Sequence, residues 1–255
     1  AMLMALDLPL PKHLAVHGWI TFNGQKMSKS LGNVVDPFVL GERYGCDAIR
    51  YHILREMALG SDSSFSNEIM INRINSDLAN DLGNLVSRTV AMVIKYFDGT
   101  LPVEKVFDDI ADSELKEMAL SVREKVDGFI DKVQINLALE EIFKVVSRAN
   151  KYIDETAPWV LAKSEDESDK EKLKSVMFHL AETMRKIAIL LTPFMPKTAE
   201  EILKQLNIPF SDKKWDLVYC DDFIAEGTKV IEKGQPLFVR LDKDEEIEYI
   251  KSSMK

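Results

Sequence analysis

The stretch QKMSKSLGN, positions 25–33, is the part of this sequence best suited to holding a phosphate group. Lys26 and Lys29 stand three positions apart, with Ser28 and Ser30 beside them. A lysine ammonium binds phosphate as a point charge, and serine hydroxyls add hydrogen bonds. The stretch is too polar to belong to a core, and its glycine disfavours a helix. The sequence therefore predicts a short basic loop that binds a phosphate, although a solvated basic turn would have the same composition.

A strand and a helix are expected to flank this loop. Residues 14–22, LAVHGWITF, are rich in β-branched and aromatic side chains, and Asn23-Gly24 is a strong hairpin-turn signal. On the other side, Asp36 precedes a proline, which predicts a helix with the aspartate as its N-cap. Asp47 is expected to cap the next helix.

The remainder of the chain predicts a bundle of helices. Positions 67–97 carry apolar residues at intervals of three and four without a proline, which indicates one helix about 45 Å long. Further helices are expected at about residues 112–131, 134–156, 168–191 and 197–206. Because the links between them are short, neighbouring helices should be antiparallel.

The composition limits the class of protein. The chain has 255 residues, 46% of them hydrophobic, which is enough for a sizeable core. The formal net charge of -9 argues against indiscriminate nucleic-acid binding, so an RNA partner would need a local patch. Cys46 and Cys220 lie far apart without zinc-type spacing, so we expect no metal bound by this chain. No signal peptide or membrane span is evident, which predicts a cytoplasmic protein with no membrane partner.

Three later blocks make the interpretation of the loop more specific. The order strand, Asn-Gly turn, KMSKS and capped helix resembles the second signature of class I aminoacyl-tRNA synthetases. The blocks DAIRYHILREMALGSDSSFS, RINSDLANDLGNLVSRT and ANKYIDETAPWVLAK resemble, in that order, the methionyl-tRNA synthetases. The resemblance covers the chain to about residue 206 and continues as scattered matches such as KGQPLFVRL.

For the loop, this resemblance implies a catalytic role with ATP as a substrate. It makes Lys26 and Lys29 catalytic and assigns ATP contacts to Lys26, Met27, Ser28, Lys29 and Ser30. Negative charge builds up on the leaving pyrophosphate, so an ammonium group placed there stabilises the transition state more than the ground state. Mg²⁺ would accompany ATP in the intact enzyme.

For the bundle, the resemblance implies recognition of the CAU anticodon by Asn84, Arg88 and Trp159. An amide and a guanidinium can bond the edge of an unpaired base, and an indole offers a stacking surface. Each residue also has a structural interpretation. Asn84 could mark close helix packing beside Gly83, Arg88 could pair with a nearby carboxylate, and Trp159 could belong to the core.

The expected fold is mainly α: an antiparallel helix bundle of the class I anticodon-binding kind, preceded by a short remnant of the α/β catalytic domain with the KMSKS loop. The first class I signature, His-Ile-Gly-His, and the methionine pocket are absent, so we expect a C-terminal fragment whose partner is the missing N-terminal catalytic domain. The expected regions are the catalytic remnant at 1–35, a stem-contact region at 36–65, the anticodon-binding bundle at 66–226, and a return segment with a helix at 227–255.

The function implied by the resemblance is that of part of a methionine-tRNA ligase, which activates methionine with ATP and transfers it to tRNA(Met). This chain would bind the anticodon stem-loop of that tRNA but would be inactive by itself. One alternative is another class I enzyme, such as the leucyl, isoleucyl, valyl or cysteinyl synthetase. The other is a free-standing tRNA-binding module without catalytic activity.

Overall fold

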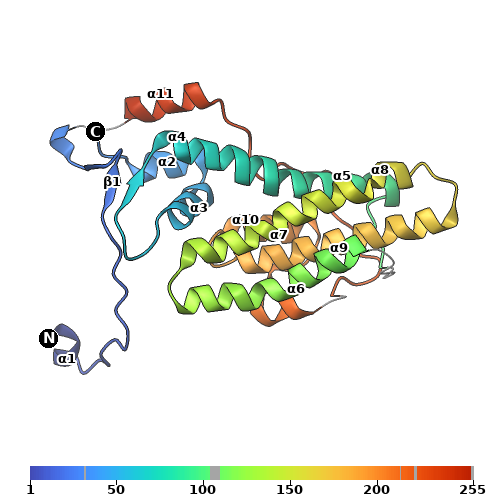
Figure 1. The fold of residues 1–255 in the computed structure, drawn as a ribbon, viewed down its shortest axis with the longest axis horizontal. Helices are drawn as coiled ribbons and strands as arrows, with labels where there is room; N and C mark the ends of the chain where they lie inside the picture. The colour runs from blue at the N-terminus through green and yellow to red at the C-terminus, as the bar shows by residue number, and fades with distance from the viewer. Residues whose placement is uncertain (32, 104–109, 213, 221–222, 254–255) are drawn as a thin grey trace.

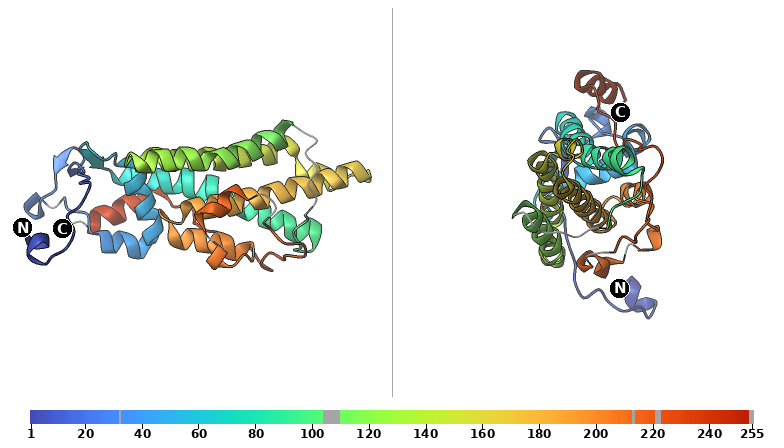
Figure 2. Two further views of the ribbon diagram at one scale, coloured as in Figure 1. Left: turned by 90° about the horizontal axis from the view of Figure 1, so that it is seen from below. Right: turned by 90° about the vertical axis from the view of Figure 1, so that its right-hand side faces the viewer.

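The computed structural model describes residues 1–31, 33–103, 110–212, 214–220 and 223–253. Within these ranges the chain is mainly helical and contains one three-stranded sheet. The sheet lies at one end of an elongated molecule, and the helices extend away from it (Figure 1 and Figure 2). The predicted fold class, a mainly α bundle with a short α/β remnant, is confirmed.

A tight hairpin leads into the basic loop. Strands β1 (Ile20–Phe22) and β2 (Gln25–Lys26) are antiparallel, and Thr21 lies opposite Lys26. The turn residues Asn23 and Gly24 both have positive φ, at 49° and 79°. A two-residue hairpin turn of this kind needs positive φ at both positions, which is why the Asn-Gly pair predicts it correctly.

Strand β3 (Ser63–Phe65) is not expected from the sequence. It pairs in parallel with β1, with Ile20 opposite Ser63, and gives the strand order β2-β1-β3. Short polar strands carry almost no periodic signal, so only the partner strand identifies this one. The strand expected at 14–22 is shorter than predicted, because pairing in the described chain begins at Ile20.

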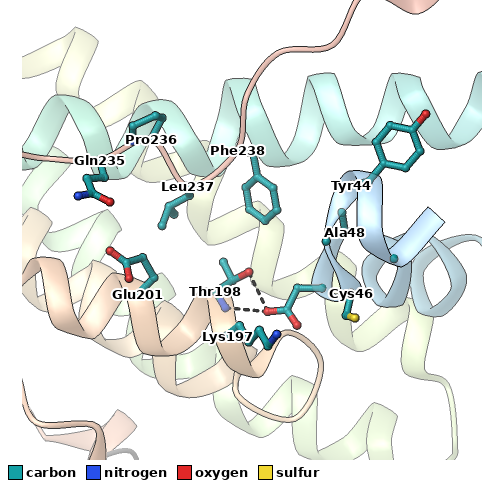
Figure 3. Close-up of a pocket in the computed structure, with 13 residues that line it drawn as sticks. Tyr44, Cys46, Ala48, Lys197, Thr198, Glu201, Gln235, Pro236, Leu237 and Phe238 are labelled. Atoms are coloured by element: carbon teal, nitrogen blue, oxygen red, sulfur yellow. Dashed lines mark hydrogen bonds between the residues drawn. The ribbon is translucent and has the colours of Figure 1, made fainter. Parts of the chain in front are cut away.

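Two helices follow the loop, and one predicted cap is wrong. Helix α2 (Pro37–Tyr44) begins as expected, since Asp36 accepts a hydrogen bond from the Phe38 amide at 2.9 Å. Helix α3 (Cys46–Glu56) instead has Gly45 as its N-cap. The buried carboxylate of Asp47 accepts bonds from the amide and the hydroxyl of Thr198, at 2.7 and 2.9 Å (Figure 3).

Asp47 therefore caps a different helix from the one predicted. Thr198 lies in the first turn of α10 (Pro196–Gln205), whose own N-cap residue makes no side-chain bond. A capping signal in a sequence gives no information on which helix N-terminus the carboxylate reaches. The contact joins α3 to α10 beside a hollow of about 300 Å³ that residues 235–238 help to line (Figure 3).

The long helix expected at 67–97 is continuous but not uniform. It begins as α4 (Asn67–Arg73), becomes π-helical over Ile74–Gly83 and ends as α5 (Asn84–Phe97). The amide of Asn150 donates to the Asp81 carbonyl at 3.0 Å, inside the π segment. A Cβ at Gly83 would lie 3.0 Å from the Leu78 carbonyl oxygen, so the last π turn is tight.

The remaining helices form the predicted bundle within two residues of the expected ends. They are α6 (Ile110–Asp131), α7 (Ile135–Thr156), α9 (Glu167–Leu191) and α10, with the short α8 (Pro158–Leu161) between α7 and α9. The core combines apolar residues of the long run, α7 and α9, among them Leu78, Leu85, Val90, Ile142, Val146, Leu180, Met184 and Leu191. Within the described ranges no helix carries an apolar stretch of the length needed to cross a bilayer.

The C-terminal segment returns to the sheet end of the molecule, as Figure 1 shows. Thr100 and Lys229 form an antiparallel bridge, and further along Asn75 exchanges two hydrogen bonds with the backbone of Leu241, at 2.8 and 3.0 Å. Helix α11 (Lys243–Ser253) then places Glu246 against Arg43 of α2 in a two-pronged ion pair. The segment is thus fixed at several points along the bundle.

We predict that Asp47→Ala lowers the free energy of unfolding by about 1–3 kcal/mol, because it leaves a buried amide and a hydroxyl without an acceptor. Urea denaturation followed by circular dichroism measures the loss. Asp166→Ala is the matched control, because Asp166 is an exposed cap that bonds only within its own helix start, to the Ser168 amide. Equal losses from both variants would contradict the cross-link between α3 and α10.

Candidate functional site

The basic loop is closed by one asparagine side chain. The Ser28 amide donates to Asn33 Oδ1 at 2.8 Å, and Asn33 Nδ2 donates to the Lys26 carbonyl at 3.2 Å. The hydroxyls of Ser28 and Ser30 lie 2.7 Å apart. Asn33 is thus bonded to the backbone of Lys26 and Ser28, and the two serine hydroxyls lie next to each other.

The side chains assigned to ATP differ in their surroundings. Lys26 is exposed at the end of β2, and its Nζ lies 5.8 Å from the ring centroid of Trp19. Met27 is half-buried and packs against the apolar core, so it anchors the loop. The backbone of Lys29 lies in a 3₁₀ turn, Lys29–Leu31, and its side chain is outside the described part of the structure.

A second group of residues lies on α5 and the adjacent α8, in the half of the molecule farther from the sheet (Figure 1). Asn84 is exposed at the start of α5, and Arg88 follows one turn later. The Arg88 guanidinium donates to Asp154 Oδ1 at 2.8 Å, and its Cζ lies 5.9 Å from the ring centroid of Trp159. The structure thus brings Arg88 and Trp159 together across two helices, with Asn84 on the adjoining turn.

The orientation of Trp159 follows from the backbone before it. Helix α7 ends at Thr156, and its C-cap residue Ala157, with a φ of 44°, turns the chain into the left-handed region. Pro158 is buried as the first residue of α8, and Trp159 remains 40% exposed. A Trp that fills the core would be almost fully covered, so the structural interpretation of Trp159 is wrong. For Arg88 the suggested carboxylate partner does exist, and it is Asp154.

The cations on the nearby face of α7 are held by carboxylates. Arg148 has only 9% of its side chain exposed and binds Glu114 and Glu155, at 3.2 and 2.9 Å. It therefore ties α6 to α7. Lys151 has 70% of its side chain exposed and lies 3.2 Å from Glu155, so it remains accessible to an anion.

Acid–base chemistry is not built into either group. Burial lowers the pKa of His52 to about 4, and this histidine is buried against Phe65 in the interior. Burial, with a smaller effect from Asp77, raises the pKa of Asp81, which precedes Asn84 on the π segment. Among the described residues no group of His, Cys, Asp and Glu has an arrangement that could hold a metal ion. The lysine and serine side chains of the loop are of the kind that binds phosphate, and the exposed indole beside Arg88 is of the kind that binds an unpaired base.

The contacts of the predicted site residues were not predicted individually. Asn33, Trp19 and Asp154 stand in stretches that the sequence singles out, but each makes its contact with Ser28, Lys26 or Arg88 only after folding. For Asp154 the sequence does offer one indication. Asp154 lies four residues after Asn150 on the same helix, so the two polar side chains share a face that could be directed at the long helix.

Two family models match the chain. Residues 1–90 match tRNA synthetases class I (M), and residues 112–254 match the anticodon-binding domain of tRNA ligase. The chain is 51% identical over its whole length to a methionine–tRNA ligase of Listeria innocua, and 54% identical over 97% of its length to one of Caldanaerobacter subterraneus. It spans 38% of the length of each of these relatives.

Solved structures agree with these matches. The chain is similar to a Mycobacterium tuberculosis methionyl-tRNA synthetase bound by methionyl-adenylate, with a TM-score of 0.85 and 38% identity. The apo form of that synthetase gives a TM-score of 0.83. The alignments cover 93% and 94% of this chain, and 46% of each solved chain.

We predict that Asn33→Ala opens the loop without unfolding the protein. Loss of its side chain removes the acceptor of the Ser28 amide, so hydrogen exchange of that amide should become faster while the free energy of unfolding changes by less than about 1.5 kcal/mol. Ser30→Ala serves as the control, because it removes only the bond between the two hydroxyls. If Ser28 exchanged equally fast in both variants, Asn33 would not be what closes the loop.

Proposed function

Since this chain belongs to the methionyl-tRNA synthetase family, we propose that it supplies the KMSKS loop and the anticodon-reading bundle of an enzyme that joins methionine to tRNA(Met). The observation that carries the proposal is the pairing of Arg88 with a half-exposed Trp159 beside Asn84. A stacking surface flanked by a guanidinium and an amide is what an unpaired base requires. The loop at the far end of the same helical run suits the polyphosphate of ATP.

In the proposed activation step, the methionine carboxylate attacks the α-phosphorus of ATP and pyrophosphate leaves. Lys26 and Lys29 would stabilise the charge that accumulates on the pyrophosphate. The hydroxyls of Ser28 and Ser30 would orient the phosphates, and Met27 would hold the loop to the core. Mg²⁺ would enter with ATP, which is a substrate of the enzyme.

In the proposed recognition step, the first anticodon base, a cytosine, stacks on Trp159. Arg88 donates to the acceptor atoms of its Watson–Crick edge, and Asn84 bonds a polar atom of the same or the next base. In the free chain Asp154 holds the Arg88 guanidinium in front of the indole, with Nη2 and Oδ1 2.8 Å apart. This exposed ion pair is weak, so it keeps the guanidinium beside the indole until a base competes for its donors.

The proposed partners are the anticodon stem-loop of tRNA(Met) and the rest of the synthetase, with a cytoplasmic location. We take residues 1–35 as the catalytic remnant, 36–65 as the stem-contact region, 66–226 as the anticodon-binding bundle and 227–255 as the return segment. The identities to methionine–tRNA ligases favour this enzyme over the leucyl, isoleucyl, valyl or cysteinyl synthetase. A tRNA-binding module without catalysis remains the alternative for the chain by itself.

We predict that the chain prefers a CAU stem-loop to one whose first anticodon base is changed. Trp159→Ala should weaken CAU binding by about 1–3 kcal/mol, the usual range for one base–aromatic stack. Arg88→Gln should cost a similar amount and remove the preference for cytosine. Fluorescence anisotropy with labelled stem-loops measures both effects.

Two controls separate base reading from other causes. Trp215→Phe alters a tryptophan whose indole donates to Asp127 at 2.8 Å, so it should lower stability and leave RNA affinity unchanged. Lys151→Gln should weaken all stem-loops equally and reduce the salt dependence. Equal binding of CAU and altered stem-loops at low salt would contradict the proposal.

We also predict that the 255-residue chain alone does not form methionyl-adenylate, because a polyphosphate loop without a methionine pocket preorganises only part of the reaction. Methionine-dependent exchange of pyrophosphate into ATP is the assay, and activity above background would contradict this.

In the complete enzyme, Lys29→Ala should reduce the adenylation rate far more than it weakens ATP binding, since its contact strengthens in the transition state.

A further inference from the structure

Trp19 is an exposed indole on a fixed backbone. Its amide donates to Asp62 Oδ1 at 2.7 Å, and its carbonyl accepts from the Ser63 amide at 2.9 Å. The chain approaches so closely here that a Cβ at Gly18 would lie 2.2 Å from the Ser61 carbonyl oxygen. Yet 73% of the Trp19 residue remains accessible to solvent. An exposed indole face on a fixed backbone can contact a cationic partner side chain.

The hairpin register supplies that partner. Thr21 lies opposite Lys26, and Trp19 is two residues before Thr21, so Trp19 and Lys26 are diagonal neighbours on one face. The Lys26 Nζ lies 5.8 Å from the ring centroid, within the range of a cation–π contact. In the part of the chain that the structure describes, Lys26 has no carboxylate partner within ion-pair distance.

We propose that Trp19 is a positioning residue for Lys26, which it holds over the indole until a polyphosphate draws the ammonium away. The proposal rests on the phosphate-binding role inferred for the loop. Lys26 then has two alternative partners, the indole face and the phosphate oxygens. The indole keeps the long side chain near the loop and away from carboxylates, while its weak hold lets the lysine transfer.

The indole and the phosphate compete for one ammonium group. Loss of the Trp19 ring should therefore increase the affinity of the loop for polyphosphate. Removing the ring raises the free energy of the unliganded state and leaves the phosphate-bound state unchanged. Affinity for polyphosphate should therefore increase by about two- to fivefold in Trp19→Leu, the change that corresponds to an exposed cation–π contact. Trp19→Phe keeps a ring face and should stay close to the original affinity.

The first measurement is the chemical shift of the Lys26 ε-methylene protons in the chain labelled with ¹³C-lysine. Ring current from Trp19 should move this signal upfield, and Lys26→Arg identifies it by its loss. The upfield shift should disappear in Trp19→Leu and be retained in part in Trp19→Phe. Lys95, whose Nζ lies 5.4 Å from the Tyr96 ring centroid, is the internal control and should be unaffected.

The second measurement is a titration of the same samples with sodium tripolyphosphate. As the ligand binds, the Lys26 signal should move to the position of a lysine without a ring neighbour. An unshifted Lys26 signal in the starting protein would overturn the positioning role of Trp19. Equal tripolyphosphate affinities of the original chain and Trp19→Leu would overturn it too. In either case, binding of tripolyphosphate would still support the phosphate-binding role of the loop. Absence of tripolyphosphate binding in every variant would overturn both the phosphate role of the loop and this proposal.

Discussion

Residues 67–97 form one helical run that begins beside the sheet and carries Asn84 and Arg88 in its second half, and its π-helical part, Ile74–Gly83, sets the direction in which α5 presents its side chains. A π turn contains more residues than an α turn, so every side chain after it is rotated relative to a uniform helix. The carbonyls of such a segment need partners, and Asn150 of α7 donates to that of Asp81. Four residues later α7 also supplies Asp154, the partner of Arg88. One face of α7 thus supports the π segment and the arginine that follows it.

The other end of the π segment is fixed by charge. Asp77 accepts hydrogen bonds from the Tyr51 hydroxyl at 2.7 Å and from Arg73 at 3.1 Å, and Arg73 also pairs with Glu56. Burial and the Asp77 carboxylate raise the pKa of Tyr51, so the hydroxyl stays a hydrogen-bond donor. These contacts join α3 to the long run next to the sheet. The long run is therefore bonded to α3 near its start and to α7 at Asp81 and Arg88.

The sequence predicts most helices because their apolar spacing is a local property that the core satisfies directly. It fails where a contact joins distant segments. Asp47 looks like the cap of its own helix and instead caps α10, and the polar residues of β3 become a strand only beside β1. The same limit applies to the sites. The residue types of Arg88 and Trp159 suggest their role, whereas Asp154 becomes visible only when α5 and α7 are packed together. The sequence does not predict the π segment either, because its apolar pattern still fits an α-helix over short stretches.

The acidity of the chain is compatible with RNA recognition because its carboxylates occupy the cations near the candidate site. Arg88 pairs with Asp154, and Arg148 pairs with Glu114 and Glu155, whereas Lys151 stays largely exposed beside Glu155. A phosphate backbone gains little from cations that are already neutralised, so non-specific binding is weakened. An exposed ion pair is worth only about 0–1 kcal/mol, however, and an additional hydrogen bond or stack easily outweighs it. A base that fits Trp159 and the Arg88 donors can therefore compete with Asp154 where a passing phosphate cannot. In the proposed mode of RNA binding, the negative charge would contribute to selectivity, since it would make binding depend on contacts that only a particular base provides.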